Sequence, residues 1–207
     1  MQDAIKKQQA VSDEKTIAIV RAARETFLAR GFDAASMDQI ALSAGVSKRT
    51  VYNRFRSKEE LFAGAIMDTC KDLLAGDAAA IESTLPPREF IRALSIQFIT
   101  ELLKPEAISL RRIAAFEAER TPAIGQAYME NGPQWMVEHC RPILDRLHDK
   151  GFLKIENSHE AIWRLGALIT EPLHTRVLMG ETPKDLGAAI AAQVDGGIDA
   201  FMKIYGA

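Results

Sequence analysis

The chain has 207 residues, 47% of them hydrophobic and 26% charged, with a formal net charge of −2. This balance is typical of a folded globular protein and excludes a largely disordered chain. There is no run of about 18 apolar residues that would span a membrane, and the polar N-terminus lacks the apolar core of a secretory signal. We therefore expect a cytoplasmic protein.

The hydrophobic pattern predicts an all-α fold, because apolar residues recur at helical spacing and do not alternate as in a half-buried strand. Ser and Pro residues mark the expected helix starts, and Gly residues mark the ends. In chain order the expected helices span residues 13–30, 36–43 (starting at Ser36 or Asp38), 48–55, 58–76, 88–103, 105–122, a short segment before Gly132-Pro133, 134–150, 159–179 with a kink at Pro172, and 183–205.

Residues 36–55 have the pattern of a helix-turn-helix. Two short helices cross closely only when the first carries a small residue and the turn holds a residue that tolerates positive φ. Ala41 supplies the small residue and Gly45 the turn. Val51 and Phe55 are spaced to turn inward together and anchor the second helix.

The outward face of that second helix is suited to DNA. Two cations, Lys48 and Arg49, lie opposite the apolar anchors and are candidates for reading guanine. Tyr52 and Asn53 share that face, where the amide of Asn53 suits adenine or a phosphate. The alternative, a basic but purely structural hairpin, is disfavoured because pattern, caps and charge agree.

Three further residues are expected to position the protein on the phosphate backbone. Ser36, Ser47 and Lys58 stand at helix starts, where free N–H groups favour a phosphate oxygen. The charge distribution also indicates a polyanion partner for the N-terminal part. Residues 1–62 carry 11 Lys and Arg against 8 Asp and Glu, whereas residues 63–207 carry 15 against 20.

The same run is similar to a known family. Residues 36–62, SMDQIALSAGVSKRTVYNRFRSKEELF, closely resemble the DNA-binding domain of TetR-family repressors. With the preceding helix, which ends at Gly31-Phe32, the resemblance covers about residues 14–62. Relatives often carry a small residue where this chain has Arg49, which here either adds a base contact or points outward. The resemblance implies DNA contacts at Lys48, Thr50, Tyr52, Asn53 and Lys58.

The resemblance also implies a domain organisation. We expect an N-terminal arm over 1–13, a three-helix DNA-binding domain over 14–62, and a larger helical-bundle domain for ligand binding and dimerisation over 63–207. Residues 111–133 are similar to the C-terminal domain of AefR-like members of the family. The implied protein is a homodimeric repressor that a small, largely apolar ligand releases from a palindromic double-stranded DNA operator.

A ligand cavity is usually mostly apolar, with a few polar groups that fix orientation. The candidates here are apolar residues of the C-terminal domain, and His139 is the polar group near Trp135 and Met136. The alternative for each residue is that it simply packs the core. The predicted ligand-binding residues are Ile66, Cys70, Phe98, Ile113, Phe116, Trp135, Met136, His139, Trp163 and Leu168.

Two apolar stripes predict a dimer surface in the last two helices, about 159–179 and 183–205. Two such stripes per chain can close a four-helix bundle with a two-fold mate. The alternative is that both stripes pack inside the chain's own core. The first stripe consists of Ile162, Leu165, Gly166, Ile169, Leu173 and Val177, and the second of Leu186, Ile190, Val194, Gly197 and Phe201.

The sequence has no enzyme pattern. A Gly-rich phosphate loop and a nucleophile elbow are missing, and the histidines have no metal-ligand spacing with each other or with cysteine, so we expect no metal and no cofactor. The histidines are His139, His148, His159 and His174. Three hypotheses remain, in order of preference: a ligand-responsive repressor, a DNA-binding regulator controlled by a protein partner, and a helical enzyme with an incidental helix-turn-helix.

Overall fold

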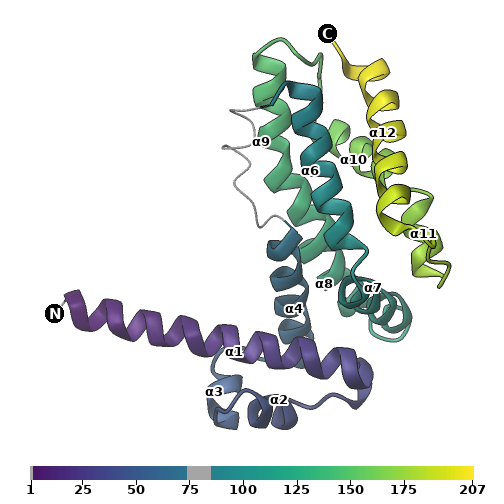
Figure 1. Cartoon of the computed structure of the whole chain (residues 1–207). Helices are drawn as coiled ribbons and strands as arrows, with labels where there is room; N and C mark the ends of the chain where they lie inside the picture. The colour runs from purple at the N-terminus through teal and green to yellow at the C-terminus, as the bar shows by residue number, and fades with distance from the viewer. Residues whose placement is uncertain (1, 74–84) are drawn as a thin grey trace. The chain divides into compact units, whose positions relative to one another are not determined.

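The computed structural model describes residues 2–73 and 85–207, with side chains for 14–71 and 85–207. This part of the chain is all-helical, as the sequence predicted, apart from an isolated β-bridge between Leu153 and Gly206. Figure 1 shows the helices, whose bounds are α1 (Gln2–Ala34), α2 (Met37–Ser43), α3 (Lys48–Tyr52), α4 (Lys58–Leu73), α6 (Pro87–Leu102), α7 (Pro105–Glu117), α8 (Pro122–Met129), α9 (Trp135–Asp149), α10 (Ser158–Thr170), α11 (Leu173–Leu178) and α12 (Leu186–Tyr205).

The helices form two compact units. Unit 1 consists of the residues up to Cys70 together with Ser109–Gly132, and unit 2 of Lys71–Ile108 with Pro133–Ala207. The sequence placed residues 109–132 in the C-terminal domain, whereas the structure groups most of α7 and all of α8 with the N-terminal helices. The expected end of the fourth helix near Gly76 lies outside the described residues.

Helix α1 is longer than the sequence predicted. It begins at Gln2 rather than at residue 13, so the backbone of the segment expected as a separate arm is helical and continuous with α1. The reason is composition, because Ala, Lys and Gln are strong helix formers and the segment contains no Gly or Pro. Gly31 interrupts the helical backbone with φ 76°, near the predicted end, and one further turn reaches Ala34.

Three phenylalanines form the aromatic core of unit 1. Phe27 stacks on Phe32 with ring centroids 5.7 Å apart, and Phe62 meets these rings edge-on at 5.3 and 5.7 Å. All three side chains are buried. Because aromatic pairs favour such offset and edge-to-face geometries, the cluster fixes α1 against α4.

A π-helical turn, Glu130–Gln134, joins α8 to α9. The sequence predicted that Gly132-Pro133 would separate two helices, and this is confirmed, since α8 ends at Met129 and α9 begins at Trp135, although the π turn keeps the backbone between them helical. Pro133 has no N–H to donate, and the wider π turn accommodates the proline without ending the helix. Gly132 packs beside Ile66 of α4, where an added Cβ would lie 3.4 Å from the Ile66 side chain, an ordinary van der Waals distance.

The chain breaks at Pro172, where the sequence predicted only a kink. Helix α10 ends at Thr170 and α11 begins at Leu173, and the Glu171–Pro172 peptide bond is cis. Carbonyls at a helix end lack intrahelical donors and need other partners. Gln193 of α12 supplies one, because its Nε2 donates to Leu168 O at 2.9 Å and to Glu171 O at 2.5 Å.

The apolar stripes of α10 and α12 are buried inside unit 2. Most of their members, among them Leu165, Ile169, Val194 and Phe201, are less than a tenth exposed and belong to one hydrophobic core. The prediction that these stripes form the dimer surface is therefore wrong, and the alternative of an internal core is confirmed. Helices α10, α12 and α6 bury one another's apolar faces within a single chain. Gly197 makes the α10–α12 crossing close, because an added Cβ would lie 2.5 Å from Leu168 O.

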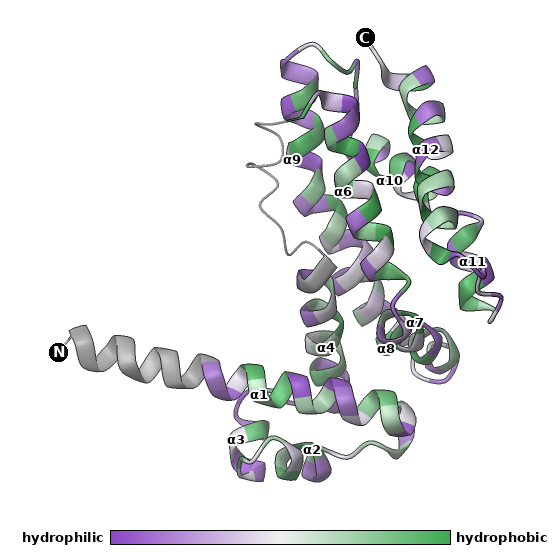
Figure 2. Ribbon diagram, in the orientation of Figure 1, coloured by the Kyte–Doolittle hydropathy of each residue, from purple (hydrophilic) through white to green (hydrophobic). Residues whose placement is uncertain are grey.

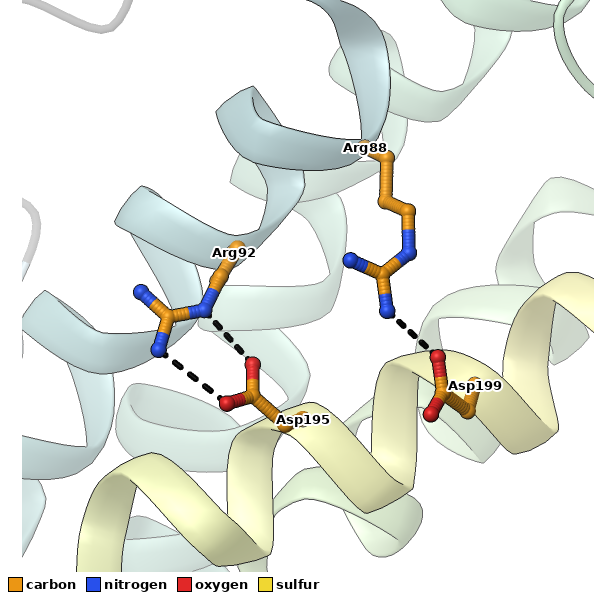
Figure 3. A network of polar contacts seen from close by, with 4 residues as sticks. All are labelled: Arg88, Arg92, Asp195 and Asp199. Carbon is orange, nitrogen blue, oxygen red and sulfur yellow. Dashed lines mark hydrogen bonds and ion pairs between the residues drawn. The ribbon is translucent and has the colours of Figure 1, made fainter. Parts of the chain in front are cut away.

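Ion pairs line the exposed rim where α6 packs on α12. Arg92 forms a two-pronged pair with Asp195, its Nε and a terminal nitrogen lying 2.6 and 3.1 Å from the two carboxylate oxygens. Arg88 pairs with Asp199 one turn further along (Figure 3). Hydrophobic and hydrophilic bands alternate along α6, α9 and α12 (Figure 2), as expected for helices with one buried face.

Candidate nucleic-acid interface

Side-chain caps fix the starts of α2 and α3. Ser36 Oγ accepts from Gln39 N–H at 3.2 Å and Gln39 Oε1 accepts from Ser36 N–H at 3.3 Å, which completes a capping box. Ser47 Oγ accepts from Thr50 N–H at 3.1 Å before α3. The predicted starts at Ser36 and Ser47 are confirmed, and each hydroxyl is used locally as a cap.

The turn between the two helices is tight, as predicted. Gly45 has φ 65°, a left-handed conformation that glycine adopts without steric cost, and Val46 N–H donates to Ala41 O at 3.0 Å. Ala41, Val51 and Phe55 are all buried, and Val51 is completely so. The apolar anchors therefore hold α3 against the rest of unit 1.

The opposite face of α3 is exposed. Lys48, Arg49, Tyr52 and Asn53 all reach the surface, and Tyr52 is 51% exposed despite its large ring. Thr50 is half-buried, and its hydroxyl shares a hydrogen bond of 2.8 Å with the capping serine. One short helix thus gathers two cations, a phenol and an amide on one accessible surface.

Lys58 is held by the C-terminal end of α1. Its Nζ donates to Phe32 O at 2.7 Å and to Asp33 O at 3.1 Å, and lies 4.3 Å from the centroid of the Phe32 ring. Carbonyls at a helix end need such external donors. Lys58 therefore joins the end of α1 to the start of α4, whether or not it also reaches a phosphate.

Two polar contacts of this region were missed by the sequence reasoning. Asp38 of α2 forms an ion pair with Lys48 of α3. Arg54 Nε donates to Thr16 Oγ1 at 2.9 Å and so ties the end of the motif to α1. The partners are 10 and 38 residues apart in the chain, so no local sequence pattern predicts these contacts.

The predicted ligand-binding residues of unit 1 divide into buried and exposed members. Ile66 and Cys70 are buried and lie together against Gly132, at 3.4 and 3.9 Å from its virtual Cβ. Ile113 is half-buried. Phe116 is 65% exposed, with the Arg120 guanidinium 5.3 Å from the centroid of its ring.

Those of unit 2 are similarly divided. Phe98 and Leu168 are partly buried against the hydrophobic core. Trp135, with Met136 half-buried beside it, stacks on the exposed His139 ring at 3.8 Å, and His139 Nδ1 lies 2.9 Å from Trp135 O. The remaining member, Trp163, is 38% exposed. A ligand-binding role for all ten residues stays a prediction.

Unit 1 also buries three titratable groups, of which the sequence reasoning singled out only Cys70. Burial raises the pKa of the Tyr128 phenol, and the neighbouring Arg111, which is hydrogen-bonded to it, opposes part of that rise. Burial also raises the pKa of the Cys70 thiol to about 12. Glu117, the last residue of α7, is 5% exposed, and its Oε2 has no hydrogen-bond partner among the described residues.

Among the described side chains, residues 14–71 and 85–207, no three His, Cys, Asp or Glu groups gather in a way that could hold a metal ion. In the same part of the chain, none of the helices is both long enough and apolar enough to cross a membrane.

Two family models match the chain. The model described as "Bacterial regulatory proteins, tetR family" matches residues 19–65, which include α2, α3 and the start of α4. The model described as "AefR-like transcriptional repressor, C-terminal domain" matches residues 89–207, more than half of the chain. The chain belongs to the TetR family, with an AefR-like C-terminal domain. As a TetR-family protein it is a DNA-binding transcriptional regulator and not an enzyme.

Characterised relatives match only part of this TetR-family chain. The transcriptional activator FasR of Mycolicibacterium smegmatis is 40% identical over 81 residues, 39% of this chain and 37% of FasR. The regulator BetI of Rhizobium meliloti is 31% identical over 108 residues, 52% of this chain and 53% of BetI. The chain therefore matches between about a third and a half of the length of these relatives.

Solved TetR-family structures match nearly the whole chain. A regulator from Mesorhizobium loti MAFF303099 aligns with a TM-score of 0.78 at 26% identity and covers 95% of this chain and 98% of its own. The flavonoid-responsive regulator FrrA aligns with a TM-score of 0.70 at 28% identity, with 93% and 97% covered. The all-helical fold expected from the sequence is thus confirmed.

Proposed function

We propose that this TetR-family chain is a cytoplasmic homodimeric repressor that binds a near-palindromic operator through α3 and is released by a small, largely apolar ligand. The observation that carries the DNA-reading part is the division of α3 into two faces. Val51 is completely buried, while Lys48, Arg49, Tyr52 and Asn53 are exposed together. Cations suit phosphates and guanine, and an amide suits adenine.

Fluorescence anisotropy across a salt series tests this function. The purified protein is titrated with duplex DNA from upstream of its own gene and with shuffled DNA of the same composition. We expect preferential, salt-sensitive binding with two chains per site, since counterion release makes phosphate contacts weaken with salt. A lack of binding to either DNA at low salt, with no effector present, would contradict the proposal.

The dimer would use the outer faces of α10 and α12, since their inner faces are buried in unit 2. Several exposed residues there are small, namely Ala167 of α10 and Ala188, Ala192 and Gly196 of α12, and small residues let two backbones approach closely. Two chains related by a two-fold would place their α3 helices in successive major grooves, roughly 34–36 Å apart.

Sedimentation velocity with two matched variants tests the dimer surface. Ala192→Glu puts a charge on the outer face of α12 and should give monomers. Ala123→Glu makes the same change at an exposed position of α8 in unit 1 and should leave dimers. Dimers from both variants would place the interface elsewhere.

The effector would act through α4. This helix starts at Lys58, at the end of the helix-turn-helix and its following loop (residues 36–58, here called the reading head), and carries Ile66 and Cys70 against Gly132. A ligand shifts a conformational equilibrium only by its difference in affinity for the two states. The flavonoid-responsive FrrA supports a small, largely apolar effector. A flavonoid panel should lower operator affinity, and Ile66→Ala and Cys70→Ser should alter that response. An unchanged response in both variants would argue against α4 as the lever.

The second candidate is a regulator controlled by a protein partner. It is favoured by Phe116, whose ring is 65% exposed on α7 and is available to another protein. Phe116→Ser tests this candidate, because it should abolish a response to a partner that docks on this ring. Since Phe116 is also among the predicted ligand-binding residues, the two candidates are distinguished on the wild type: release from DNA by the flavonoid panel in purified protein, with no partner present, would favour the small-molecule effector.

A further inference from the structure

The ion pair between Asp38 and Lys48 lies in the middle of the reading head. Residues 36–58 contain five cations and a single acid, Asp38. The carboxylate of that acid binds the Nζ of Lys48, the first residue of α3. Both side chains are open to solvent, with 65% of Lys48 and 52% of Asp38 exposed. The one negative charge of the segment is thus paired with Lys48, a side chain expected to contact DNA.

The fold of the reading head has little need of this pair. Exposed ion pairs contribute about 0–1 kcal/mol, because water and salt screen the charges. The crossing of α2 and α3 is already fixed by buried Ala41 and Val51 and by the turn at Gly45. An acid at this place also repels phosphates and so weakens binding to any DNA. A role in recognition explains its position better than a role in stability.

Helix caps fix the backbone positions from which both charged side chains extend. Asp38 lies within the capping box that Ser36 forms with Gln39, and Lys48 directly follows the cap residue Ser47. The pair therefore presents a donor and an acceptor side by side on a surface that does not have to be ordered during binding.

We propose that Asp38 and Lys48 together read one G·C base pair in each half-site. Guanine presents the acceptors O6 and N7 in the major groove, which suit a lysine ammonium, and its cytosine presents the N4 amino donor, which suits a carboxylate. An A·T pair fits less well, because adenine offers the lysine a single acceptor, N7, beside its N6 amino donor, whereas guanine offers two acceptors. Away from the base edges the carboxylate keeps Lys48 from binding a phosphate. Asp38 is thus a specificity-determining residue, and this role rests on the proposed reading of DNA by α3.

Selection from a random duplex library with the full-length protein tests the pair. Wild-type, Asp38→Ala and Asp38→Asn proteins are compared, and the selected sites are then changed one base pair at a time. For the wild type, changing one particular G·C pair in each half-site to A·T should lower the DNA affinity by roughly 5- to 150-fold. Asp38→Ala should reduce that loss several-fold, bind random DNA more tightly and steepen the salt slope by about one unit, because Lys48 is freed for a phosphate.

The matched control is Asp68→Ala, which removes an acid from α4 and breaks its 3.2 Å pair with Arg24 away from α2 and α3. Asp38→Asn keeps the side-chain shape and guards against a folding defect in the alanine variant. If wild type enriches no sequence, the DNA-reading function itself fails. If wild type enriches a site but both Asp38 variants select the same base pairs as Asp68→Ala, the inference about Asp38 is overturned.

Discussion

Arginines are ion-paired on one surface of this molecule and exposed without an ion-pair partner on another. Along the rim of α6 and α12, Arg88 and Arg92 each pair with an aspartate of the facing helix. On α3, Arg49 is exposed and has no ion-pair partner among the described residues. A cation that is already paired gains little from a phosphate, whereas an unpaired one releases a counterion on binding. The unpaired Arg49 thus distinguishes the exposed face of α3 from the rim of α6 and α12, whereas Lys48 on the same face is paired with Asp38.

The largest effect is expected at Arg49. Arg49→Ala should weaken operator binding by roughly 5- to 150-fold per half-site and random DNA by less, because a bidentate arginine–guanine contact is lost. The control Arg88→Ala should leave DNA affinity unchanged, which anisotropy titrations can measure for both variants. An equal loss on operator and random DNA would reassign Arg49 to the phosphate backbone.

Lys58 tests whether one cation can both stabilise the fold and bind DNA. Lys58→Met removes the hydrogen bonds to Phe32 O and Asp33 O and the contact with the Phe32 ring. Urea unfolding should show a loss of about 1–2 kcal/mol. If Lys58 also reaches a phosphate, the salt slope of DNA binding should fall by about one unit. Unchanged stability would show that its contacts with α1 contribute nothing.

Glu117 is a buried acid, and its Oε2 lacks a hydrogen-bond partner among the described residues. Glu117→Gln should raise the free energy of unfolding by about 1 kcal/mol, because a neutral amide is less costly to bury than a carboxylate. The exposed neighbour provides the control, as Glu119→Gln should leave urea unfolding unchanged. A destabilised Glu117→Gln protein would mean that the carboxylate has a favourable role.

The smallest effect is expected at the α6–α12 rim. The hydrogen bonds and charge of Arg92 lower the pKa of Asp195 below its usual 3.8. A lowered carboxyl pKa adds stability above the unfolded-state pKa, and this is lost as pH falls through the folded-state pKa. Asp195→Asn should therefore be slightly less stable near pH 7, and the two unfolding curves should converge below about pH 3. A gap that persists at low pH would contradict this assignment.

Local signals in the sequence determined the helix-turn-helix. Ser47 caps the start of α3 through the N–H of a residue only three positions later, and Gly45 permits a left-handed turn. Val51 and Phe55 fall on one face by helical periodicity alone. Each of these depends on neighbours in the chain, so the motif and its exposed face were predicted correctly.

Only the tertiary structure decided what distant residues do to one another. The apolar stripes of α10 and α12 were correctly located but assigned to a partner chain, because a pattern shows that a face is buried and not what buries it. The carbonyls that hold Lys58 lie 26 and 25 residues away, and the acid that binds Lys48 lies 10 residues away. Such contacts depend on helix packing, which no local spacing encodes.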